Sequence, residues 1–263
     1  MILLLVLSVS IFNLAYSLRC INNCTMIYSM NQSFILSSNC SYISSHRCSV
    51  KLVFWYERRN YVVRFPGDLL NDDNIDDNRH FMMIEVAMNT FFSYDINHVC
   101  KDKDDCARYY AEKKINEMTQ RSFNISNIYN DLERILYRNK SFNDHDLLCF
   151  DSNEDIRQCT IARMIGSCQI IDDLIKYKTH RRICQRHSQE SASVNIYDSN
   201  SFALMTIKCN RMLCNGPLTI QAVKNVLNHH HITNIHGRLS ANSSRISIKY
   251  YLFIFLFFVI FSN

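Results

Sequence analysis

Cysteine is the residue type with the most definite chemistry in this 263-residue chain. The chain has an even set of twelve cysteines, which begins at Cys20, behind an apolar N-terminal stretch. Such a set is typical of disulfides formed in an oxidising compartment. Zinc is the alternative chemistry, but zinc sites favour C-x-x-C pairs, and the sequence has none. We therefore expect six disulfides among Cys20, Cys24, Cys40, Cys48, Cys100, Cys106, Cys149, Cys159, Cys168, Cys184, Cys209 and Cys214.

Four histidines near the C-terminus are weak candidates for metal ligands. They lie in the stretch NHHHITNIH, at His229, His230, His231 and His236. On a helix, consecutive histidines point in different directions, because only residues three or four apart share a face. We therefore interpret the stretch as a polar helix end that leads into a membrane-proximal stalk, and we predict neither a metal site nor a cofactor.

The familiar sequence motifs of catalysis are missing. The chain has no GxSxG elbow, HExxH pair, Walker loop or GxGxxG turn. Its four glycines, Gly67, Gly166, Gly216 and Gly237, stand too far apart to cradle a phosphate. Serine, histidine and aspartate side chains could still meet from distant segments. The sequence therefore favours a non-enzymatic protein and leaves open an anchored or secreted hydrolase.

The first 17 residues have the form of a secretory signal peptide. Residues 2–14 are apolar except for three polar side chains, and the segment has no acidic residue. Ala15 and Ser17 occupy the small-residue positions of a cleavage site, so Leu18 would begin the mature chain. A signal anchor is the alternative, but a membrane span needs about 20 apolar residues. We predict a cleaved signal peptide at residues 1–17.

The chain ends in an apolar tail, residues 250–263, that is short for a membrane span. Its apolar run from Tyr250 to Phe261 would reach about 18 Å as a helix, against a hydrocarbon core of about 30 Å. A polar stalk with small residues, 237–249, precedes the tail. This order is typical of a glycosylphosphatidylinositol (GPI) anchor signal, whose tail is removed. The candidate attachment residues are Ser240, Asn242 and Ser243.

Six N-x-S/T triplets fit passage through the secretory pathway. One of them, at Asn242, competes with the anchor site. A glycosylated asparagine must lie at the surface, so the triplets also predict exposed positions. We expect N-glycosylation at Asn23, Asn31, Asn39, Asn124 and Asn139.

The net charge of +5, from 29 basic and 24 acidic side chains, is too small and too dispersed for nucleic-acid binding. We interpret the densest basic patch, around Arg181 and Arg182, as a solvated loop or helix end. We predict a protein on the extracellular face of the plasma membrane that binds an extracellular protein or glycan, or forms a surface coat. A short single-pass membrane protein and a soluble secreted ligand are the alternatives.

Alternating apolar residues predict two β-hairpins that would form the framework of the fold. The second spans residues 192–209 and turns at residues 198–201, and residues 81–100 predict further strand. The first spans residues 48–67 and directs to one side Val50, Leu52, Phe54, Tyr56, Tyr61, Val63 and Phe65.

Apolar residues at helical spacing predict three helices. The first follows Asp104 and Asp105, residues of a type that caps helices, and the third starts at Pro217, a residue favoured at the first helical position. The stripes of the three helices are Ala107, Tyr110, Ile115 and Met118; Ile128, Leu132, Ile135 and Leu136; and Ile220, Val223 and Leu227.

The cysteines divide six and six around a polar stretch at residues 139–145. Each half ends with a predicted strand, a pair of cysteines close in sequence, and an amphipathic helix. We therefore predict an α+β, disulfide-rich secreted ectodomain made of two related modules, residues 18–140 and 141–236. A single α+β domain is the alternative.

Two short motifs resemble the three-finger superfamily, which includes snake toxins and surface proteins of the urokinase-receptor type. They are the closing string CNRMLCN, Cys209–Asn215, and the opening LRCINNC after the predicted cleavage site. Lys208 stands where the superfamily has an adjacent cysteine. The resemblance implies a local bridge between Cys209 and Cys214 and a structural role for Asn215. Many members of the superfamily carry a lipid anchor, which agrees with the interpretation of the C-terminal tail.

Overall fold

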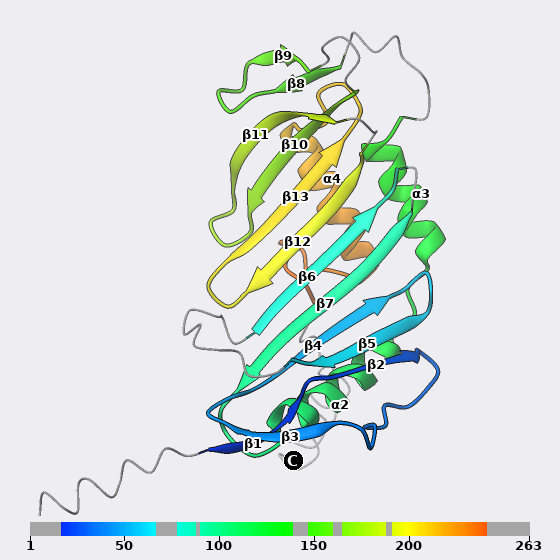
Figure 1. Cartoon of the computed structure of the whole chain (residues 1–263). Coiled ribbons are helices and arrows are strands. Elements are labelled where there is room, and N and C mark those ends of the chain that lie inside the picture. The colour runs from blue at the N-terminus through cyan, green and yellow to red at the C-terminus, as the bar shows by residue number, and fades with distance from the viewer. Residues whose placement is uncertain are drawn as a thin grey trace, which may run out of the picture.

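A computed structural model describes residues 17–66, 78–87, 90–138, 147–159, 165–187 and 191–240. Its main feature is a nine-stranded antiparallel sheet (Figure 1). In order across the sheet, the strands are β11 (Lys178–His187), β10 (Ile165–Asp173), β13 (Ala203–Cys209), β12 (Ser193–Ser199), β6 (Asn78–Glu85), β7 (Phe91–Cys100), β4 (Cys48–Trp55), β5 (Asn60–Phe65) and β2 (Cys24–Ser29).

Two small sheets lie beside the main one. β1 (Leu18–Asn22) pairs with β3 (Ser41–Ser45), and β8 (Leu148–Phe150) pairs with β9 (Ile156–Gln158). Within the described residues the fold is therefore disulfide-rich and dominated by sheet.

The main sheet is built from two halves that use the same strand order. The N-terminal half contributes β5, β4, β7 and β6, with β2 added at its edge, and the C-terminal half contributes β11, β10, β13 and β12. Strands β6 and β12 pair across the junction, with Met82 opposite Ile196. One continuous cluster of buried side chains underlies both halves. The two halves thus share one sheet and one core.

Within the described residues, three helices lie against one side of this sheet (Figure 1). They are α2 (Cys106–Thr119), α3 (Ile125–Leu136) and α4 (Pro217–His229). Helix α2 contacts β4 and β7, and α3 contacts α4. The apolar stripes predicted from the sequence are largely the buried ones, and Pro217 does open α4. Three-residue and four-residue spacing therefore identified the core-facing sides correctly.

The predicted hairpins are also present. Strands β4 and β5 form the first, and strands β12 and β13 form the second around the turn that follows Asp198. The side chains predicted to share a face, from Val50 to Phe65, are all buried. Tyr56 and Tyr61 belong to this buried set, so aromatic packing stabilises the core there.

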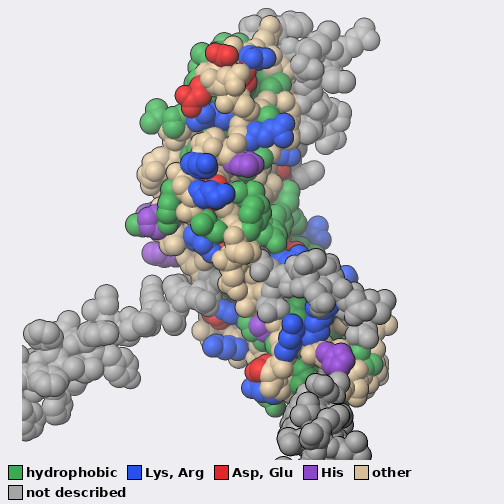
Figure 2. Space-filling model, turned by 90° about the vertical axis from the view of Figure 1, so that its left-hand side faces the viewer, with side chains coloured by type: hydrophobic (Ala, Val, Ile, Leu, Met, Phe, Trp, Pro, Cys, Tyr) green, Lys and Arg blue, Asp and Glu red, His purple; other side chains and the backbone are tan. Residues whose placement is uncertain are grey.

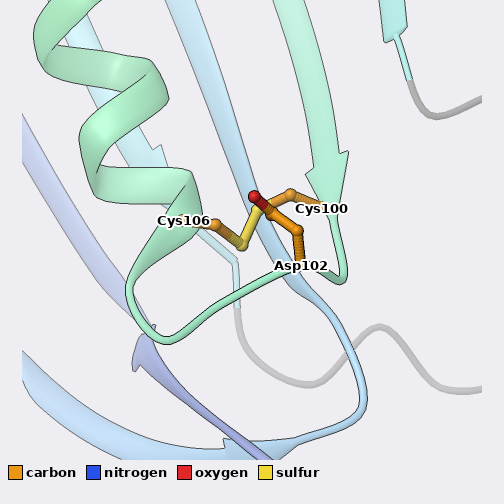
Figure 3. A group of neighbouring side chains, drawn as sticks. All are labelled: Cys100, Asp102 and Cys106. Carbon is orange, nitrogen blue, oxygen red and sulfur yellow. A yellow bond between two sulfur atoms is a disulfide. The ribbon is translucent and has the colours of Figure 1, made fainter.

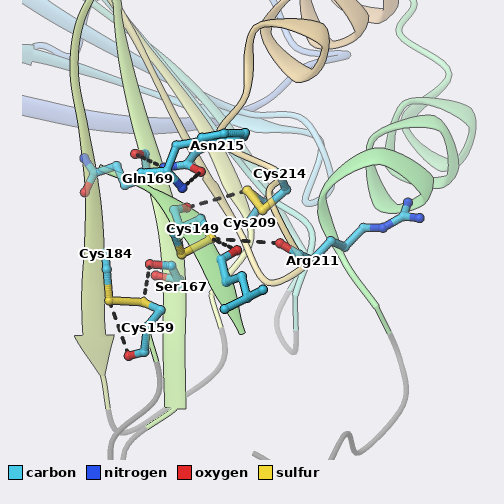
Figure 4. The surroundings of a disulfide bond; sticks show 12 residues. Cys149, Cys159, Ser167, Gln169, Cys184, Cys209, Arg211, Cys214 and Asn215 are labelled. Atoms are coloured by element: carbon cyan, nitrogen blue, oxygen red, sulfur yellow. Dashed lines mark hydrogen bonds between the residues drawn. A yellow bond between two sulfur atoms is a disulfide. The ribbon is translucent and has the colours of Figure 1, made fainter. Parts of the chain in front are cut away.

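All twelve cysteines form disulfides, and each bridge stays within its half of the chain. Figure 4 shows the bridges of the C-terminal half beside β10 and β11. The bridge between Cys209 and Cys214, which the resemblance implied, is among them. The six bridges are Cys20–Cys48, Cys24–Cys40, Cys100–Cys106, Cys149–Cys168, Cys159–Cys184 and Cys209–Cys214.

Three local expectations were wrong. Arg181 and Arg182 lie in strand β11 rather than in a loop or helix end, and Arg182 is buried. Its guanidinium donates from Nε to the Asn215 carbonyl (3.1 Å) and from Nη1 to Glu154 Oε1 (2.7 Å). Asp105 precedes α2, but its side chain makes no cap hydrogen bond. Partners in the β8–β9 turn and in the segment before α4 explain the buried arginine, and such distant partners cannot be identified from local sequence.

The third correction concerns the expected stalk. Residues 237–240 belong to the folded unit: Leu239 is buried, and Arg238 binds Asp198. Ser240 donates its N–H to the Ile232 carbonyl (3.1 Å). Residues 237–240 are therefore part of the folded unit and not of a stalk.

Several predicted features lie outside the described residues. They are most of the signal peptide, Asn139, the candidate attachment residues Asn242 and Ser243, and the apolar tail, residues 250–263. Within the ranges that are described, no helix has the length and apolar character needed to cross a membrane.

Candidate functional site

A polar pocket of about 510 Å³ lies where the two halves meet. We call it the junction pocket. Its walls come from β6 and α2 of the N-terminal half, and from the β10–β11 turn, the end of β12 and the segment after α4 in the C-terminal half. The lining residues are Asn78, His80, Tyr110, Lys114, Tyr177, Asp198, Ser199, Asn200, Asn234, His236, Arg238 and Leu239.

The pairing of β6 with β12 creates the floor of the junction pocket. In this register His80 stands opposite Asp198. The chain after α4 then folds back along the end of β12, where the Leu239 N–H donates to Asp198 Oδ2 (2.9 Å). The site therefore exists only when both halves are folded and paired.

The wall from the N-terminal half is a network of aromatic and imidazole rings. The rings of His98 and Tyr110 stack with centroids 3.6 Å apart, and His98 Nδ1 hydrogen-bonds Asn78 Oδ1. His80 Nδ1 lies 3.3 Å from the Tyr94 hydroxyl. Stacking and hydrogen bonds on several sides fix these rings, so this wall is preorganised.

His80 is neutral at physiological pH. Burial, and secondly the nearby Lys114 ammonium, lower its pKa to about 4. Burial also raises the pKa of the Tyr94 hydroxyl, which therefore stays protonated. The direction of the hydrogen bond between the Tyr94 hydroxyl and His80 Nδ1 depends on the imidazole tautomer. In either tautomer His80 adds no charge to the junction pocket.

The wall from the C-terminal half is organised by an arginine–aspartate pair. Arg238 donates to Asp198 Oδ1 from Nε (2.8 Å), and its Nη2 lies 2.6 Å from the same oxygen. Nη2 also donates to the Ser199 carbonyl (3.1 Å). The hydrogen bond to Asp198 raises the pKa of the Arg238 guanidinium. This pair joins the segment after α4 to the end of β12.

The second cation that lines the junction pocket, Lys114, is also paired with a carboxylate. Lys114 is buried on α2, and its ammonium lies 2.8 Å from Glu117 Oε2, one turn along the helix. Glu117 in turn binds Arg121 at 3.2 Å. Each cation that lines the junction pocket thus has a carboxylate partner within salt-bridge distance.

An exposed aromatic ring lies at the mouth of the junction pocket. Tyr177 is 64% exposed, and its ring meets that of His236 edge to face with centroids 5.1 Å apart. Ile175, Phe202 and Ile235, on turns of the C-terminal half but outside the lining of the junction pocket, are also exposed. Figure 2, which views the molecule from the side of these turns, shows hydrophobic side chains among Lys, Arg and His over the upper part of the molecule.

The junction pocket contains Ser, Asp and His, the residue types of a hydrolase, but their hydrogen bonds do not form a triad. The Ser199 hydroxyl donates to the Phe202 carbonyl (2.9 Å) and accepts from the Phe202 N–H (3.1 Å). Asp198 is occupied by Arg238 and Leu239. With a pKa of about 4, His80 is also too weak a base for efficient general-base catalysis near neutral pH. These side chains are therefore held by structural hydrogen bonds.

The four candidate metal-binding histidines do not converge. His230 Nε2 binds Asp131 Oδ2 on α3 (3.0 Å), whereas His236 packs on Tyr177. Among the described residues, one group brings three potential ligand atoms within 4.8 Å of one another, namely Cys100, Asp102 and Cys106 (Figure 3). Its two sulfurs form a disulfide, which has no thiolate to donate to a metal.

Asn215 has the structural role that the resemblance implied. It is fully buried beside the Cys209–Cys214 bridge (Figure 4). Its Oδ1 accepts from the Phe150 N–H (2.9 Å), and its Nδ2 donates to the carbonyls of Phe150 (2.7 Å) and Gln169 (3.3 Å). One side chain therefore joins β8 and β10 to the start of the α4 segment.

Four of the predicted glycosylation sites lie within the described residues. Asn23, Asn31, Asn39 and Asn124 are all exposed. Asn124 also caps α3, because its Oδ1 accepts from the Asn127 N–H (3.2 Å). A cap bond to Oδ1 leaves the amide nitrogen, where a glycan attaches, directed elsewhere.

The chain matches no protein-family model and no curated protein. A function therefore has to be inferred from the chemistry of the site. Sequence reasoning did not find the junction pocket, since its residues come from five separate segments and follow no motif.

Proposed function

We propose that the protein is a non-enzymatic, disulfide-stabilised binding ectodomain whose ligand site is the junction pocket. The observation that carries this proposal is a preorganised polar pocket of about 510 Å³ with walls from both halves. Its volume falls in the range of about 300–1,000 Å³ that is usual for ligand sites. Its hydrogen-bonding groups are fixed by neighbouring residues, and this lowers the entropy lost on binding.

The proposed location is the extracellular face of the plasma membrane. Six disulfides fit an oxidising compartment, and the exposed asparagines of four N-x-S/T triplets fit N-glycosylation. A signal peptide at residues 1–17 and a GPI anchor attached near residue 242 complete this proposal, and both are supported by the sequence.

Phospholipase treatment tests the anchor. Intact cells that display the full chain are treated with a phosphatidylinositol-specific phospholipase. We expect release of the protein into the medium, because cleavage of the lipid would leave nothing in the bilayer. Retention of correctly displayed protein on the cells would contradict the anchor and favour the short membrane-inserted tail.

A melting-temperature panel tests the binding function. The purified full chain is heated with separate sets of saccharides, amino acids, nucleosides and small carboxylic acids. We expect at least one compound to raise the melting temperature, by about 5 °C when it is present at about 100 times its dissociation constant. Asn200→Trp, which places a bulky ring in the pocket lining, should abolish the rise.

A matched variant controls for the added tryptophan. Asn116 is exposed on α2 and does not line the junction pocket, so Asn116→Trp should respond as the unmodified protein does. If no compound class shifts the melting temperature, or if both variants keep the shift, the junction pocket is not the ligand site.

A further inference from the structure

We infer that the junction pocket selects a neutral saccharide. This inference rests on the proposed binding function and adds the chemical class of the ligand. It follows from three properties of the described lining residues, which are charge compensation, the supply of hydrogen-bond donors and acceptors, and an aromatic surface at the mouth.

Charge compensation disfavours an ionic ligand. Arg238 is held by Asp198 at 2.6 Å and Lys114 by Glu117 at 2.8 Å, so both cations are already paired. His80 adds no charge at neutral pH, since its pKa is about 4. An anion would have to compete with a carboxylate already in place and would lose its own hydration in doing so. A neutral ligand avoids both costs.

The polar groups of the lining suit a ligand with hydroxyl groups. Asn78 and Asn234 use their side-chain oxygens internally, because Asn78 Oδ1 binds His98 and Asn234 Oδ1 accepts the N–H groups of His236 and Arg238. Their NH₂ groups are therefore the parts left to donate. The Tyr110 and Tyr177 hydroxyls add acceptors. A sugar hydroxyl both donates and accepts, so it matches this mixture.

The mouth supplies the apolar contact that a sugar ring needs. One face of a pyranose carries C–H groups, and such a face packs well on an aromatic ring. Tyr177 is 64% exposed and is braced on one side by His236, so its ring is available at the entrance. A purely apolar ligand would instead leave the buried polar groups of the pocket without partners. Ring packing and hydroxyl recognition together indicate a saccharide about one or two rings in size.

Saturation-transfer NMR on the purified full chain tests the ligand class. The neutral probes are glucose, mannose, galactose, N-acetylglucosamine and lactose, and the charged probes are glucuronic acid, sialic acid and glucosamine. We expect transfer to the ring protons of at least one neutral probe and weaker binding of the charged ones. Tyr177→Ala should weaken that binding about tenfold, the effect of losing one aromatic contact.

Tyr109→Ala is the matched control, because Tyr109 is similarly exposed, at 56%, and does not line the junction pocket. The dissociation constant of the neutral probe should be the same for the Tyr109→Ala variant and the unmodified protein. Tighter binding of an acidic sugar, or equal binding by both tyrosine variants, would overturn the inference. If an amino acid or nucleoside raises the melting temperature and no sugar does, the saccharide class is wrong and the binding function stands. If no class of compound does so, both fail.

Discussion

The two halves of the sheet share a strand order but fasten their helices differently. Helix α4 of the C-terminal half is held to the sheet by an ion pair between Lys224 and Asp172 (2.7 Å), whose side chains are 12% and 6% exposed. The corresponding helix of the N-terminal half, α2, carries the pair Arg108–Glu112 on its exposed side. One half thus has an ion pair between helix and sheet, whereas Arg108–Glu112 and the partly buried Lys114–Glu117 join residues of α2 to one another.

The two halves also differ in the residue that follows a shared type of disulfide. In both halves a strand ends in a cysteine that bridges forward along the chain: Cys100 to Cys106 at the start of α2, and Cys209 to Cys214 in the turn before α4. Asn215, which follows the second of these bridges, ties down two strands, whereas the equivalent position after Cys106 is the apolar Ala107. The common bridge sets the strand-to-helix turn, and Asn215 adds hydrogen bonds in the C-terminal half that Ala107 cannot make with its methyl side chain.

Helix α3 shows that the halves are not independent. It belongs to the N-terminal half by sequence, yet it packs on α4, and Asp131 binds His230 there (3.0 Å). The carbonyl of Leu136 at its end accepts from the Asn210 N–H (3.0 Å). The predicted boundary near residue 140 therefore separates the halves in sequence, but α3 connects them in space.

The buried ion pair between Lys224 and Asp172 gives the sharpest test of how differently α4 and α2 are held. Lys224→Met leaves Asp172 buried without its cation, and we expect a loss of about 4 kcal/mol in the free energy of unfolding. Arg108→Ala removes the exposed counterpart and should cost about 0.3 kcal/mol. Urea unfolding of both variants measures the two values. Equal losses would show that the two helices are held alike.

Removal of the asparagine tie should have the next largest effect. Asn215→Ala deprives the Phe150 N–H and the carbonyls of Phe150 and Gln169 of their partner. We expect the free energy of unfolding to fall by about 3 kcal/mol, because buried polar groups without partners are costly. The same urea titration serves as the measurement. A change below about 1 kcal/mol would mean that the bridge alone holds this corner.

The smallest of these three expected effects is a pH dependence of stability. It is measured for one histidine on each wall of the junction pocket. The pKa of His80 falls from its ordinary 6.5 to about 4 in the folded protein, so the unfolded chain binds more protons between these values. Stability contributed by neutral His80 is therefore present above about pH 6.5 and is lost as the pH falls toward 4. Between pH 7 and pH 5 we expect the unmodified protein to lose about 1–2 kcal/mol more than His80→Gln does.

His236 provides the control for that experiment, because it is exposed on the opposite wall. His236→Gln should lose stability with falling pH as the unmodified protein does. If His80→Gln also follows the unmodified curve, the wall from the N-terminal half does not hold a neutral imidazole.

Local elements of the fold were predictable, and their assembly was not. The alternation from Val50 to Phe65 was sufficient to predict the first hairpin, and the helical spacing from Ile220 to Leu227 was sufficient to predict α4. Each pattern is local, and one face of each element is buried. The β6–β12 pairing joins residues more than a hundred positions apart, and no turn fixes its register. The hairpin of β10 and β11 was missed, because Arg181 and Arg182 indicated a solvated segment.

The disulfides and the candidate site also differ in how far the sequence predicts them. The even cysteine count identified the bonding partners as a set, but six cysteines allow 15 pairings, so the connectivity depended on the fold. The junction pocket is still less visible, since Asn78, Lys114 and Arg238 carry no shared pattern and meet through three separate elements. A site assembled across a domain junction requires the tertiary structure before its chemistry can be described.

Hydrogen exchange tests the central claim most directly, which is that both halves form one ligand site. The full chain is labelled with and without the panel compound that most raises its melting temperature. We predict slower exchange in residues 78–80 of the N-terminal half and also in residues 234–239 of the C-terminal half, because both line the junction pocket. Protection confined to one half, or located away from the junction, would contradict the account.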